Sequence, residues 1–447
     1  MKKLKKENWV LLWVIGMAGQ ICWNLENQWF NTFVYNEIAP DHTIVSWMVA
    51  ISAVFTTFST FFFGTLSDRI GKRKPFIAIG YILWGIFTIL FGSTMFLTSA
   101  LSGKLAVIAT FVVLADALMS FFGSMGNDSG FNAWIGDILN DENRGGIGAA
   151  LAAQPVLGTI IGTLLGGFII VAFGYFAFFT IMGVIVILIG IFALLKMKDS
   201  KNLKPVKNGS FWHQFASAFN FKRFFRQKEL VVVNVMIAIF FISFNVYFVH
   251  IGNLFIYNYQ FDESEAGIIQ GVGLLVAVLF TIPASKLINK DKSPFVILLT
   301  LIVNFVGLMV LFLFSAKSEP SALFSLTNVP LFLGIILCGI GYVLFMQTTM
   351  VWVKKLYPIE ERGQYEGIRI IFFVLIPMIL GPMIANPVIE GANKKTYIKY
   401  DEIYLKGFVP TEKLFIVAAI ISLLTFIPLF FANKHHKERI KEKCKKD

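Results

Sequence analysis

Long apolar runs alternate with short polar segments along the whole chain. Each run holds about 20 or more mostly apolar residues, the length an α-helix needs to cross a hydrocarbon core about 30 Å thick. Lipid offers the backbone no hydrogen-bond partners, so the runs are predicted to be helices. The predicted spans cover residues 8–36, 43–66, 75–98, 105–137, 145–172, 175–196, 229–258, 264–288, 294–316, 329–355, 362–388 and 411–433. The predicted fold class is an all-α membrane protein with twelve transmembrane helices.

Three sequence matches at offsets of 218 to 222 residues indicate an internal repeat. They pair Asn31–Asn36 with Asn253–Asn258, Pro75–Phe76 with Pro294–Phe295, and Trp134–Gly145 with Trp352–Gly363. Matches in the same order at nearly one offset predict two parallel six-helix halves. Some transporters are built from parallel repeats that hold substrate between them near the middle of the bilayer.

The polar segments divide the chain into four predicted parts. These are an N-terminal bundle (1–196), a cytoplasmic linker (197–228), a C-terminal bundle (229–433) and a basic cytoplasmic tail (434–447). The linker mixes Lys222, Arg223 and Arg226 with aromatic residues, which is typical of an interfacial helix on anionic lipid. A solvated linker is the alternative interpretation.

The positions of the charged residues along the chain determine how the net charge is interpreted. Only 15% of the residues are charged and 56% are hydrophobic, whereas a soluble domain carries about 25% charged residues. The net charge of +12 could suggest a nucleic-acid partner. With both termini in the cytoplasm, however, 31 of the 39 Lys and Arg residues fall in cytoplasmic segments. The excess therefore predicts orientation in a cell membrane, plasma or inner, and no nucleic-acid binding.

The loop after the second span carries a family signature. Gly64–Pro75, GTLSDRIGKRKP, resembles the pattern G-x-L-x-D-R-x-G-R-K of the major facilitator superfamily. The resemblance covers the whole chain and implies a solute transporter that works by alternating access. It gives Asp68, with Arg69 and Arg73 as partners, a role in closing the cytoplasmic side. The predicted cytoplasmic gate consists of Gly64, Asp68, Arg69, Gly71, Lys72, Arg73, Arg144 and Arg362.

A finer resemblance lies at the end of the fourth span. Asn127–Asp137 is similar to the corresponding segment of the glycoside–pentoside–hexuronide:cation symporters and their sucrose/proton relatives. In that group an Asp at this place takes part in sugar and cation binding, and Asp128 matches it. The acidic pair of the group's second span is missing from Thr56–Phe63. The resemblance thus implies coupling to protons, or no coupling, rather than coupling to sodium.

Polar side chains within the spans are candidates for the binding site, because they are costly in lipid. Four amide side chains of the first span, Gln20, Asn24, Asn27 and Asn31, lie on one face of the predicted helix and form an amide stripe. This stripe could bind hydroxyl groups of a polar solute or join neighbouring helices. Glu26 lies off this stripe and is a candidate for proton coupling, together with Asp128; a contact with a neighbouring helix is its alternative role. Asp116 is expected to be structural. The predicted substrate-binding residues are Gln20, Asn24, Asn27, Asn31, Ser124, Asp128, Asn132, Asn245, Asn253 and Gln347.

Two functions from different classes of transport remain open. The favoured one is proton-coupled uptake of a sugar, glycoside or similar polar solute by a monomer without a cofactor or a metal. The alternative is proton-coupled export of drugs or metabolites, since Gly158–Gly167 resembles the antiporter signature apart from Thr163, where that signature has Pro. An enzyme is disfavoured because the sequence contains no metal-binding, phosphate-binding or nucleophile motif.

Overall fold

The computed structural model describes residues 5–101, 103–139, 143–199, 203–206, 209–217, 221–318, 323–357, 362–400 and 403–444. The chain divides into two compact units. Unit 1 comprises Met1–Ala218, Asp262–Gly267 and Lys395–Phe408, and unit 2 comprises Phe219–Phe261, Ile268–Lys394 and Val409–Asp447. Each unit is described by itself below.

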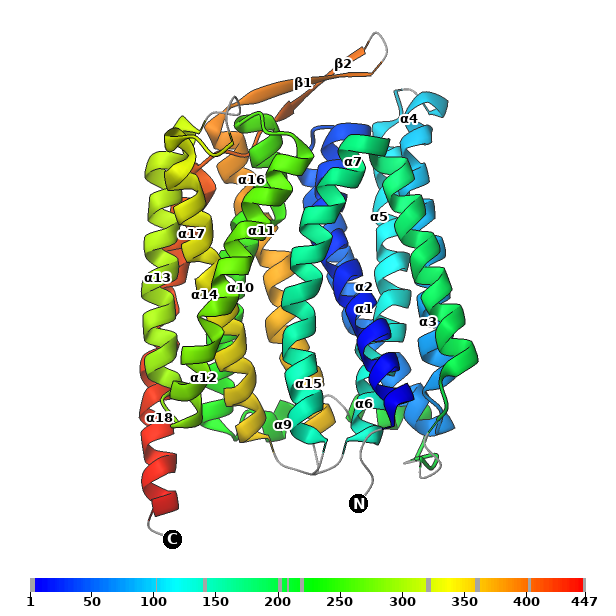
Figure 1. Cartoon of the computed structure of the whole chain (residues 1–447), viewed down its shortest axis with the longest axis vertical. Coiled ribbons are helices and arrows are strands. Elements are labelled where there is room, and N and C mark those ends of the chain that lie inside the picture. The colour runs from blue at the N-terminus through cyan, green and yellow to red at the C-terminus, as the bar shows by residue number, and fades with distance from the viewer. Residues whose placement is uncertain are drawn as a thin grey trace. The chain divides into compact units, whose positions relative to one another are not determined.

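Unit 1 is a helical bundle (Figure 1). Its elements are α1 (Lys6–Phe33), η1 (Val34–Ile38), α2 (His42–Ile70), α3 (Lys74–Ser93), η2 (Thr94–Phe96), α4 (Leu97–Ala100), α5 (Leu105–Ser124), η3 (Met125–Phe131), α6 (Asn132–Ile138), α7 (Arg144–Lys196) and α8 (Phe211–Ser217). Within α7, Gly174 has non-helical dihedral angles (φ 79°, ψ 169°), which only glycine adopts readily. This break separates the fifth predicted span from the sixth.

Unit 2 is also a helical bundle. Its elements are α9 (Phe221–Phe224), α10 (Lys228–Asn253), η4 (Leu254–Asn258), most of α11 (Glu263–Leu279), α12 (Thr281–Asn289), α13 (Ser293–Phe314), η5 (Ser315–Lys317), η6 (Leu326–Asn328), α14 (Val329–Leu356), α15 (Arg362–Ile370), η8 (Ile371–Leu375), α16 (Ile376–Ala392), α17 (Lys413–Leu424) and α18 (Phe426–Cys444). Phe240 and Phe345 stack at a centroid distance of 3.7 Å in its core.

The helices account for the predicted spans. Among the described residues, nine helices are long and apolar enough to cross a membrane, or ten if α11 and α12, which are bent by 41°, form one span. The break at Gly174 divides one of the nine into two. The 28-residue helix α1 is not among them because its amides and Glu26 lower its mean hydropathy. With α1 counted, the prediction of a twelve-helix membrane protein is confirmed.

The internal repeat has a counterpart in the backbone. The repeated segments Asn31–Asn36 and Asn253–Asn258 end the first helix of each half, and each helix finishes there in a π-helical turn, η1 or η4. π-Helical turns are rare, so their occurrence at equivalent places supports the repeat independently of the sequence.

One element was not predicted. Between the eleventh and twelfth predicted spans, β1 (Lys395–Tyr400) and β2 (Ile403–Phe408) form an antiparallel hairpin, with Lys395 opposite Phe408. The hairpin belongs to unit 1, in which the hydroxyl of Tyr35 donates a hydrogen bond to the carbonyl oxygen of Phe408 (3.2 Å).

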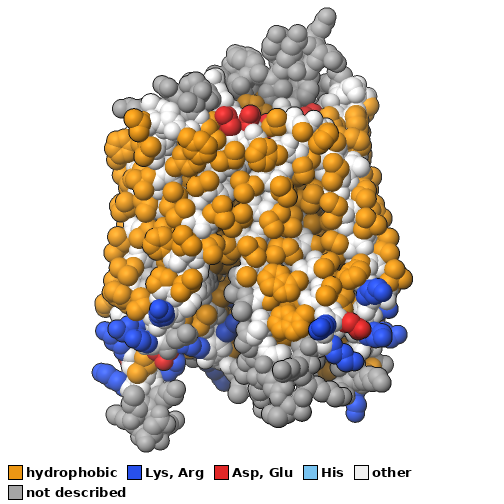
Figure 2. Space-filling view, in the orientation of Figure 1, with side chains coloured by type: hydrophobic (Ala, Val, Ile, Leu, Met, Phe, Trp, Pro, Cys, Tyr) orange, Lys and Arg blue, Asp and Glu red, His pale blue; other side chains and the backbone are white. Residues whose placement is uncertain are grey.

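The surfaces of the helices match a bilayer environment. Figure 2 shows hydrophobic side chains over the lateral face of the helices and Lys and Arg side chains near one end of them. Large exposed apolar side chains such as Leu195 (72% exposed) and Phe173 (69%) would be costly in water but suit contact with lipid.

Candidate functional site

Glu26 lies at the centre of a buried polar cluster in unit 1. Its side chain is 7% exposed, and Oε1 accepts hydrogen bonds from Ser52 of α2 and Ser120 of α5, both at 2.6 Å. The two hydroxyl oxygens are themselves 2.7 Å apart. Oε2 has no hydrogen-bond partner among the described residues. Glu26 therefore meets two neighbouring helices through hydroxyl groups, and neither Ser52 nor Ser120 stands out in sequence from other serines in apolar helices.

Asp116, which is expected to be structural, lies in the same helix as Ser120 of this cluster. It is 1% exposed and sits one helical turn before Ser120, whose hydroxyl also donates to its backbone oxygen (2.9 Å). Neither carboxylate oxygen has a hydrogen bond of standard geometry from the described residues. The sequence spacing alone could not reveal its approach to Glu26, because that depends on how α1 and α5 pack.

Asp128 lies in η3, the π-helical continuation of α5. It is half-buried and accepts a hydrogen bond from Nδ2 of Asn127 (3.3 Å). Its electrostatic repulsion reaches Glu26. Tyr81 of α3 packs against the same turn, donating to Ile15 O (2.8 Å) and lying 3.1 Å from Asn127 Oδ1. Asp128 thus belongs to a polar group with Asn127 and Tyr81 in unit 1.

The π-helical turn alters the predicted face of the fourth span. Ser124, Asp128 and Asn132 would share one face of a regular α-helix, but a π-helix has i→i+5 hydrogen bonds and a wider turn. Ser124 is fully buried and donates to Thr56 O of α2 (3.0 Å), whereas Asn132 is exposed. Of these three residues, only Asp128 and Asn132 reach the surface of unit 1.

The amide stripe of α1 has two different environments. Gln20 and Asn24 face α7, where a Cβ added to Gly158 or Gly162 would lie 2.7 Å from Gln20 Cβ or 2.5 Å from Asn24 Oδ1. Thr163 donates a long hydrogen bond to Asn24 (3.3 Å) and a shorter one to Gln28 (2.8 Å). The side-chain amides of Asn27 and Asn31 donate to backbone oxygens one turn earlier in α1. Part of the stripe therefore joins helices, as the alternative interpretation holds, while Gln20 and Asn27 stay partly exposed.

The predicted residues of the C-terminal half lie in unit 2. Asn253 is fully buried, and Asn245, 7% exposed, packs against Gly381 of α16 and donates to Phe241 O (2.8 Å). Gln347 is half-buried and donates to Ser285 Oγ (2.6 Å). Among these residues Gln347 is the most accessible to a solute.

Arg73 is the centre of the predicted gate in unit 1. Its guanidinium group pairs with Asp68 (2.6 Å) and Asp137 (3.0 Å) and donates to Ser67 Oγ (2.6 Å). Burial alone lowers the pKa of Arg73, but the attraction of Asp68 and the hydrogen bond to Asp137 raise it above its ordinary value. Of the two expected partners of Asp68, the structure brings Arg73 to it, and Asp137 is a partner of Arg73 that the sequence analysis missed.

The remaining gate residues have separate contacts. Gly71 ends α2 in the left-handed conformation (φ 68°), and a Cβ there would lie 2.8 Å from the backbone nitrogen of Pro205. Arg69 turns to the linker, donating to Gly209 O (2.9 Å) and Gln214 Oε1 (3.1 Å). Lys72 is exposed, and Gly64 has room for a side chain, with Ser129 Oγ 3.8 Å from an added Cβ. The side chains of Arg144 and Arg362 lie outside the described residues.

Unit 2 has its own ionic network near the start of α10. Glu229 accepts hydrogen bonds from Arg439 of α18 (2.8 Å) and from the indole nitrogen of Trp352 (2.8 Å). His436 Nε2 lies 2.8 Å from the backbone oxygen of Asp291. A hydrogen bond from Lys355 (2.8 Å) lowers the pKa of the Asp291 carboxyl. Trp352 is thus held by an acidic partner, while Trp134, its repeat equivalent, is buried against Phe131.

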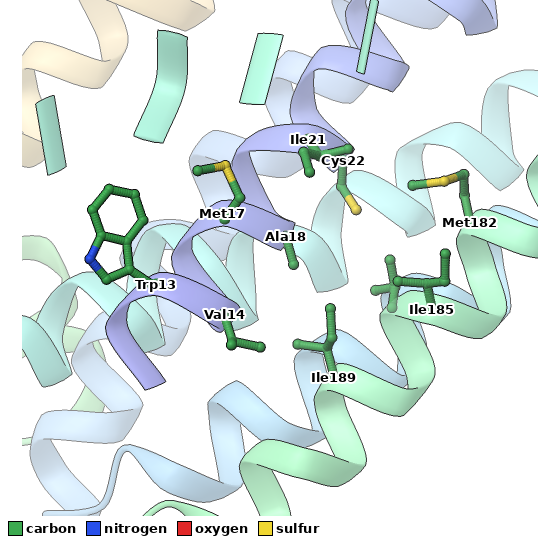
Figure 3. Close-up of a pocket in the computed structure, with 10 residues that line it drawn as sticks. Trp13, Val14, Met17, Ala18, Ile21, Cys22, Met182, Ile185 and Ile189 are labelled. Atoms are coloured by element: carbon green, nitrogen blue, oxygen red, sulfur yellow. The ribbon is translucent and has the colours of Figure 1, made fainter. Parts of the chain in front are cut away.

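A surface groove of about 390 Å³ lies between α1 and the second half of α7 (Figure 3). It is lined by Trp13, Val14, Met17, Ala18, Ile21, Cys22, Met182, Ile185, Val186 and Ile189. This mostly apolar lining matches acyl chains of lipid and offers few hydrogen-bonding groups to a polar solute. The groove is therefore distinct from the polar cluster around Glu26.

Several solved structures of membrane transporters have a similar fold. The chain resembles the crystal structure of a mutant of the nucleoside transporter NupG (TM-score 0.70, 12% identity, 95% of this chain and 99% of that chain covered). It also resembles a bacterial homologue of the lysosomal transporter Spinster in an inward-facing, unoccupied conformation (TM-score 0.70, 14% identity, 98% and 99% covered). A third similar structure is a bacterial homologue of the iron transporter ferroportin in an inward-facing state (TM-score 0.68, 14% identity, 97% and 99% covered).

At these identities the likeness shows the fold, and the sequence decides the family. No curated protein matches the sequence. The model of the Major Facilitator Superfamily matches residues 12–323 and 254–446, which together span nearly the whole chain. The chain therefore belongs to the major facilitator superfamily of membrane transporters.

Proposed function

We propose that this transporter takes up a sugar, glycoside or similar polar solute together with protons, by alternating access of its two halves. The observation that carries the proposal is the environment of Glu26, a buried carboxyl group bound by two hydroxyls and the one charged residue within the predicted span 8–36. A permanent charge at such a place is costly without a cation beside it. A carboxyl group there can bind and release a proton during the cycle, which is what coupling requires.

The polar groups that stay accessible suit an uncharged, hydroxyl-rich solute. Gln20, Asn27, Asp128 and Asn132 in unit 1 and Gln347 in unit 2 are half-buried or exposed. Amides both donate hydrogen bonds to hydroxyl groups and accept them, and carboxylates accept them. Few such groups are needed to orient a sugar. Asn24, Asn31, Ser124, Asn245 and Asn253 are buried and, in this proposal, support the accessible groups.

Export of drugs or metabolites is the less favoured function. The signature that suggested it, Gly158–Gly167, has a packing explanation, since its glycines at 158 and 162 let α7 approach Gln20 and Asn24 of α1. A close helix approach of this kind needs small residues whatever the direction of transport.

The proposal extends to orientation and assembly. We infer that both termini face the cytoplasm of a plasma or inner membrane, that Arg73 and Asp68 act in the cytoplasmic gate, and that the transporter works as a monomer. The charge distribution of the sequence supports the orientation.

A thermal-shift screen of the purified full chain tests the substrate class. Sugars, glycosides, nucleosides and cationic dyes are the probes; a ligand at 100 times its Kd stabilises the folded state by about 2.7 kcal/mol. We expect a sugar or glycoside to raise the melting temperature and the dyes to leave it unchanged. Stabilisation by cationic dyes alone would support export and contradict uptake.

Asp128→Asn tests the coupling part of the proposal with the ligand identified by the screen. We expect the variant to reach the membrane in normal amounts and to lose uptake driven by a pH gradient, because Asn cannot exchange a proton. Normal proton-driven accumulation by Asp128→Asn would remove Asp128 from the coupling site.

A further inference from the structure

We propose that α8 (Phe211–Ser217) is a membrane-interface helix that places Trp212 among phospholipids and holds the gate loop, Asp68–Arg73, through Arg69. The partner is the phospholipid surface of the bilayer. Insertion of α8 into that surface stands on contacts within unit 1 and can be measured without transport, whereas its effect on the gate rests on the proposed function. The helix lies before the basic stretch Lys222–Arg226 from which an interfacial helix is expected.

Aromatic side chains join α8 to the side of α2. Phe211 and Phe215 are four residues apart and share one face of α8, and Phe58 and Phe62 share one face of α2 in the same way. The ring of Phe211 lies edge-on to Phe62 (5.2 Å between centroids), and the ring of Phe215 lies edge-on to Phe58 (6.0 Å). Phe58 is 44% exposed on a helix that is long and apolar enough to span a membrane. The helix α8 therefore lies on the lipid-facing side of α2.

The position of these contacts along α2 gives the depth of α8. Phe62 and Phe58 precede Asp68 by 6 and 10 residues, which is about 9 and 15 Å along the helix axis at 1.5 Å per residue. The headgroup region on one side of a bilayer is about 5–8 Å thick, and interfacial helices bury their apolar faces about 5–10 Å deep. With Asp68 at the boundary with water, α8 lies at the depth of the interface, too deep for a solvated linker.

Trp212 is the side chain of α8 that lipid would cover. It is 63% exposed, and its ring lies beside those of Phe211 (5.1 Å) and Phe215 (5.8 Å). An exposed indole at this depth suits the membrane interface, where the ring meets acyl chains and the N–H group meets headgroup oxygens and water. The helix, FWHQFAS, contains no Lys, Arg, Asp or Glu. It can therefore enter the interface without burying one of these charged side chains.

The linker just before α8 is fastened to the gate loop. The backbone N–H of Val206 donates a hydrogen bond to the backbone oxygen of Asp68 (2.9 Å). A Cβ added to Gly71 would lie 2.8 Å from the backbone nitrogen of Pro205, so the two segments are in contact. The exposed Lys204 adjoins this contact, and its ammonium group suits the phosphate of a headgroup. The linker thus presents a cation close in sequence to the aromatic helix, a combination that matches a phospholipid surface.

Arg69 connects α8 itself to the gate loop. Its Nη1 donates to the backbone oxygen of Gly209 (2.9 Å) and to Gln214 Oε1 (3.1 Å). Between these two acceptors, Ser210 begins the helix, because its hydroxyl accepts a hydrogen bond from the backbone N–H of His213 (3.2 Å), as an N-cap side chain does. Since Arg69 follows Asp68 directly, α8 cannot leave the membrane surface without breaking hydrogen bonds of the gate loop.

Fluorescence of the full chain in phosphatidylcholine nanodiscs tests the position of Trp212. The signal of wild type minus that of Trp212→Phe isolates this residue among the nine tryptophans. We expect lipids brominated in the upper acyl chain to quench the Trp212 signal and the aqueous quencher iodide to leave it nearly unchanged. Quenching by iodide and not by brominated lipid would overturn the proposal, because Trp212 would then face water, as a docking site for a protein partner also would.

Trp212→Glu tests whether membrane insertion of α8 holds the gate loop. A charge is excluded from this depth, so we expect the amides of 203–206, 211–217 and Asp68–Arg73 to exchange hydrogen about tenfold faster than in wild type in the same nanodiscs. Trp212→Phe keeps an apolar ring and should exchange as wild type does. Exchange in Trp212→Glu equal to that of wild type would contradict the connection between α8 and the gate loop.

The outcomes for α8 and for the proposed function are distinguishable. Quenching of Trp212 by brominated lipid together with uptake that ignores a pH gradient would support the insertion of α8 and refute proton coupling. Quenching by iodide together with proton-driven uptake would refute the insertion and leave the coupling intact.

Discussion

At the scale of single residues, glycine 162 shows how α1 and α7 depend on each other. It leaves space for Asn24, and its carbonyl oxygen accepts a hydrogen bond from the indole nitrogen of the fully buried Trp29 (3.1 Å). The same approach places the amides of α1 beside α7 and leaves Glu26 to face α2 and α5.

Gly162→Ala should therefore destabilise the fold. The new Cβ would lie 2.5 Å from Asn24 Oδ1, and overpacking of this kind costs about 1–3 kcal/mol. Gly148→Ala is the matched control in the same helix, because no described atom lies within 4 Å of its added Cβ and alanine favours a helix by about 1 kcal/mol over glycine. Thermal unfolding in detergent should show a lower midpoint for Gly162→Ala alone; equal midpoints for both variants would contradict the packing.

At the scale of elements, Arg73 joins the end of α2, the start of α3 and the end of α6. Its side chain is 8% exposed, whereas that of Asp68 is 47% exposed. The backbone amides of Arg73 and Lys74 both donate to Asp199 (2.7 and 2.9 Å), so an acidic residue that follows α7 also caps the start of α3.

Arg73→Lys should cost more stability than Asp68→Asn. Lysine cannot reproduce the forked contacts to Asp68 and Asp137, and lost charged hydrogen bonds are worth about 1.5–3 kcal/mol, while an exposed ion pair is worth about 0–1 kcal/mol. Asp68→Asn should slow transport more than it weakens ligand binding, since it would loosen the proposed cytoplasmic gate and leave the polar cluster around Glu26 untouched. Melting midpoints, with the exposed Lys104→Gln as a charge control, rank the variants. A larger drop in the melting midpoint for Asp68→Asn than for Arg73→Lys would contradict the assignment of Arg73 as the centre of these contacts.

At the scale of the whole molecule, the internal repeat can be recognised in the sequence, but the two halves differ in their ionic contacts. The N-terminal half concentrates ionic contacts on Arg73, whereas unit 2 ties the C-terminal helix α18 to the start of α10 through Glu229, Arg439 and Trp352. This second network includes Arg439 and His436 of the predicted tail, so the described part of α18 that contains them packs in unit 2.

Arg439→Gln should detach α18 from Glu229. The Glu229 side chain is 10% exposed, and leaving a largely buried carboxylate with fewer partners costs about 3–5 kcal/mol for a fully buried pair and less here, because Arg439 is 36% exposed. Limited proteolysis should cut within α18 faster in Arg439→Gln than in Lys441→Gln, a neighbouring charge change outside the network. Equal rates of cleavage would show that Arg439 does not hold the tail.

The twelve spans and the family could be predicted because hydropathy and a loop motif are local in sequence. The approach of Asp116 to Glu26 could not, since it depends on the packing of α1, α2 and α5. Ser124 and Asn132 would share a face at regular α-helical spacing, but the π-helical turn lies between them, and Ser124 is buried whereas Asn132 is exposed. The hairpin at Lys395–Phe408 was missed because its alternating pattern is short and lies beside longer apolar runs.

The central claim is that proton binding at Glu26 drives uptake of a polar solute. The most direct measurement is accumulation of the solute identified by thermal shift in liposomes that contain the full chain, with and without an imposed pH gradient. We predict that wild type and Glu7→Gln, an exposed change in the same helix, accumulate solute only with the gradient, and that Glu26→Gln binds solute but does not accumulate it. Gradient-driven accumulation by Glu26→Gln equal to that of wild type would contradict the claim.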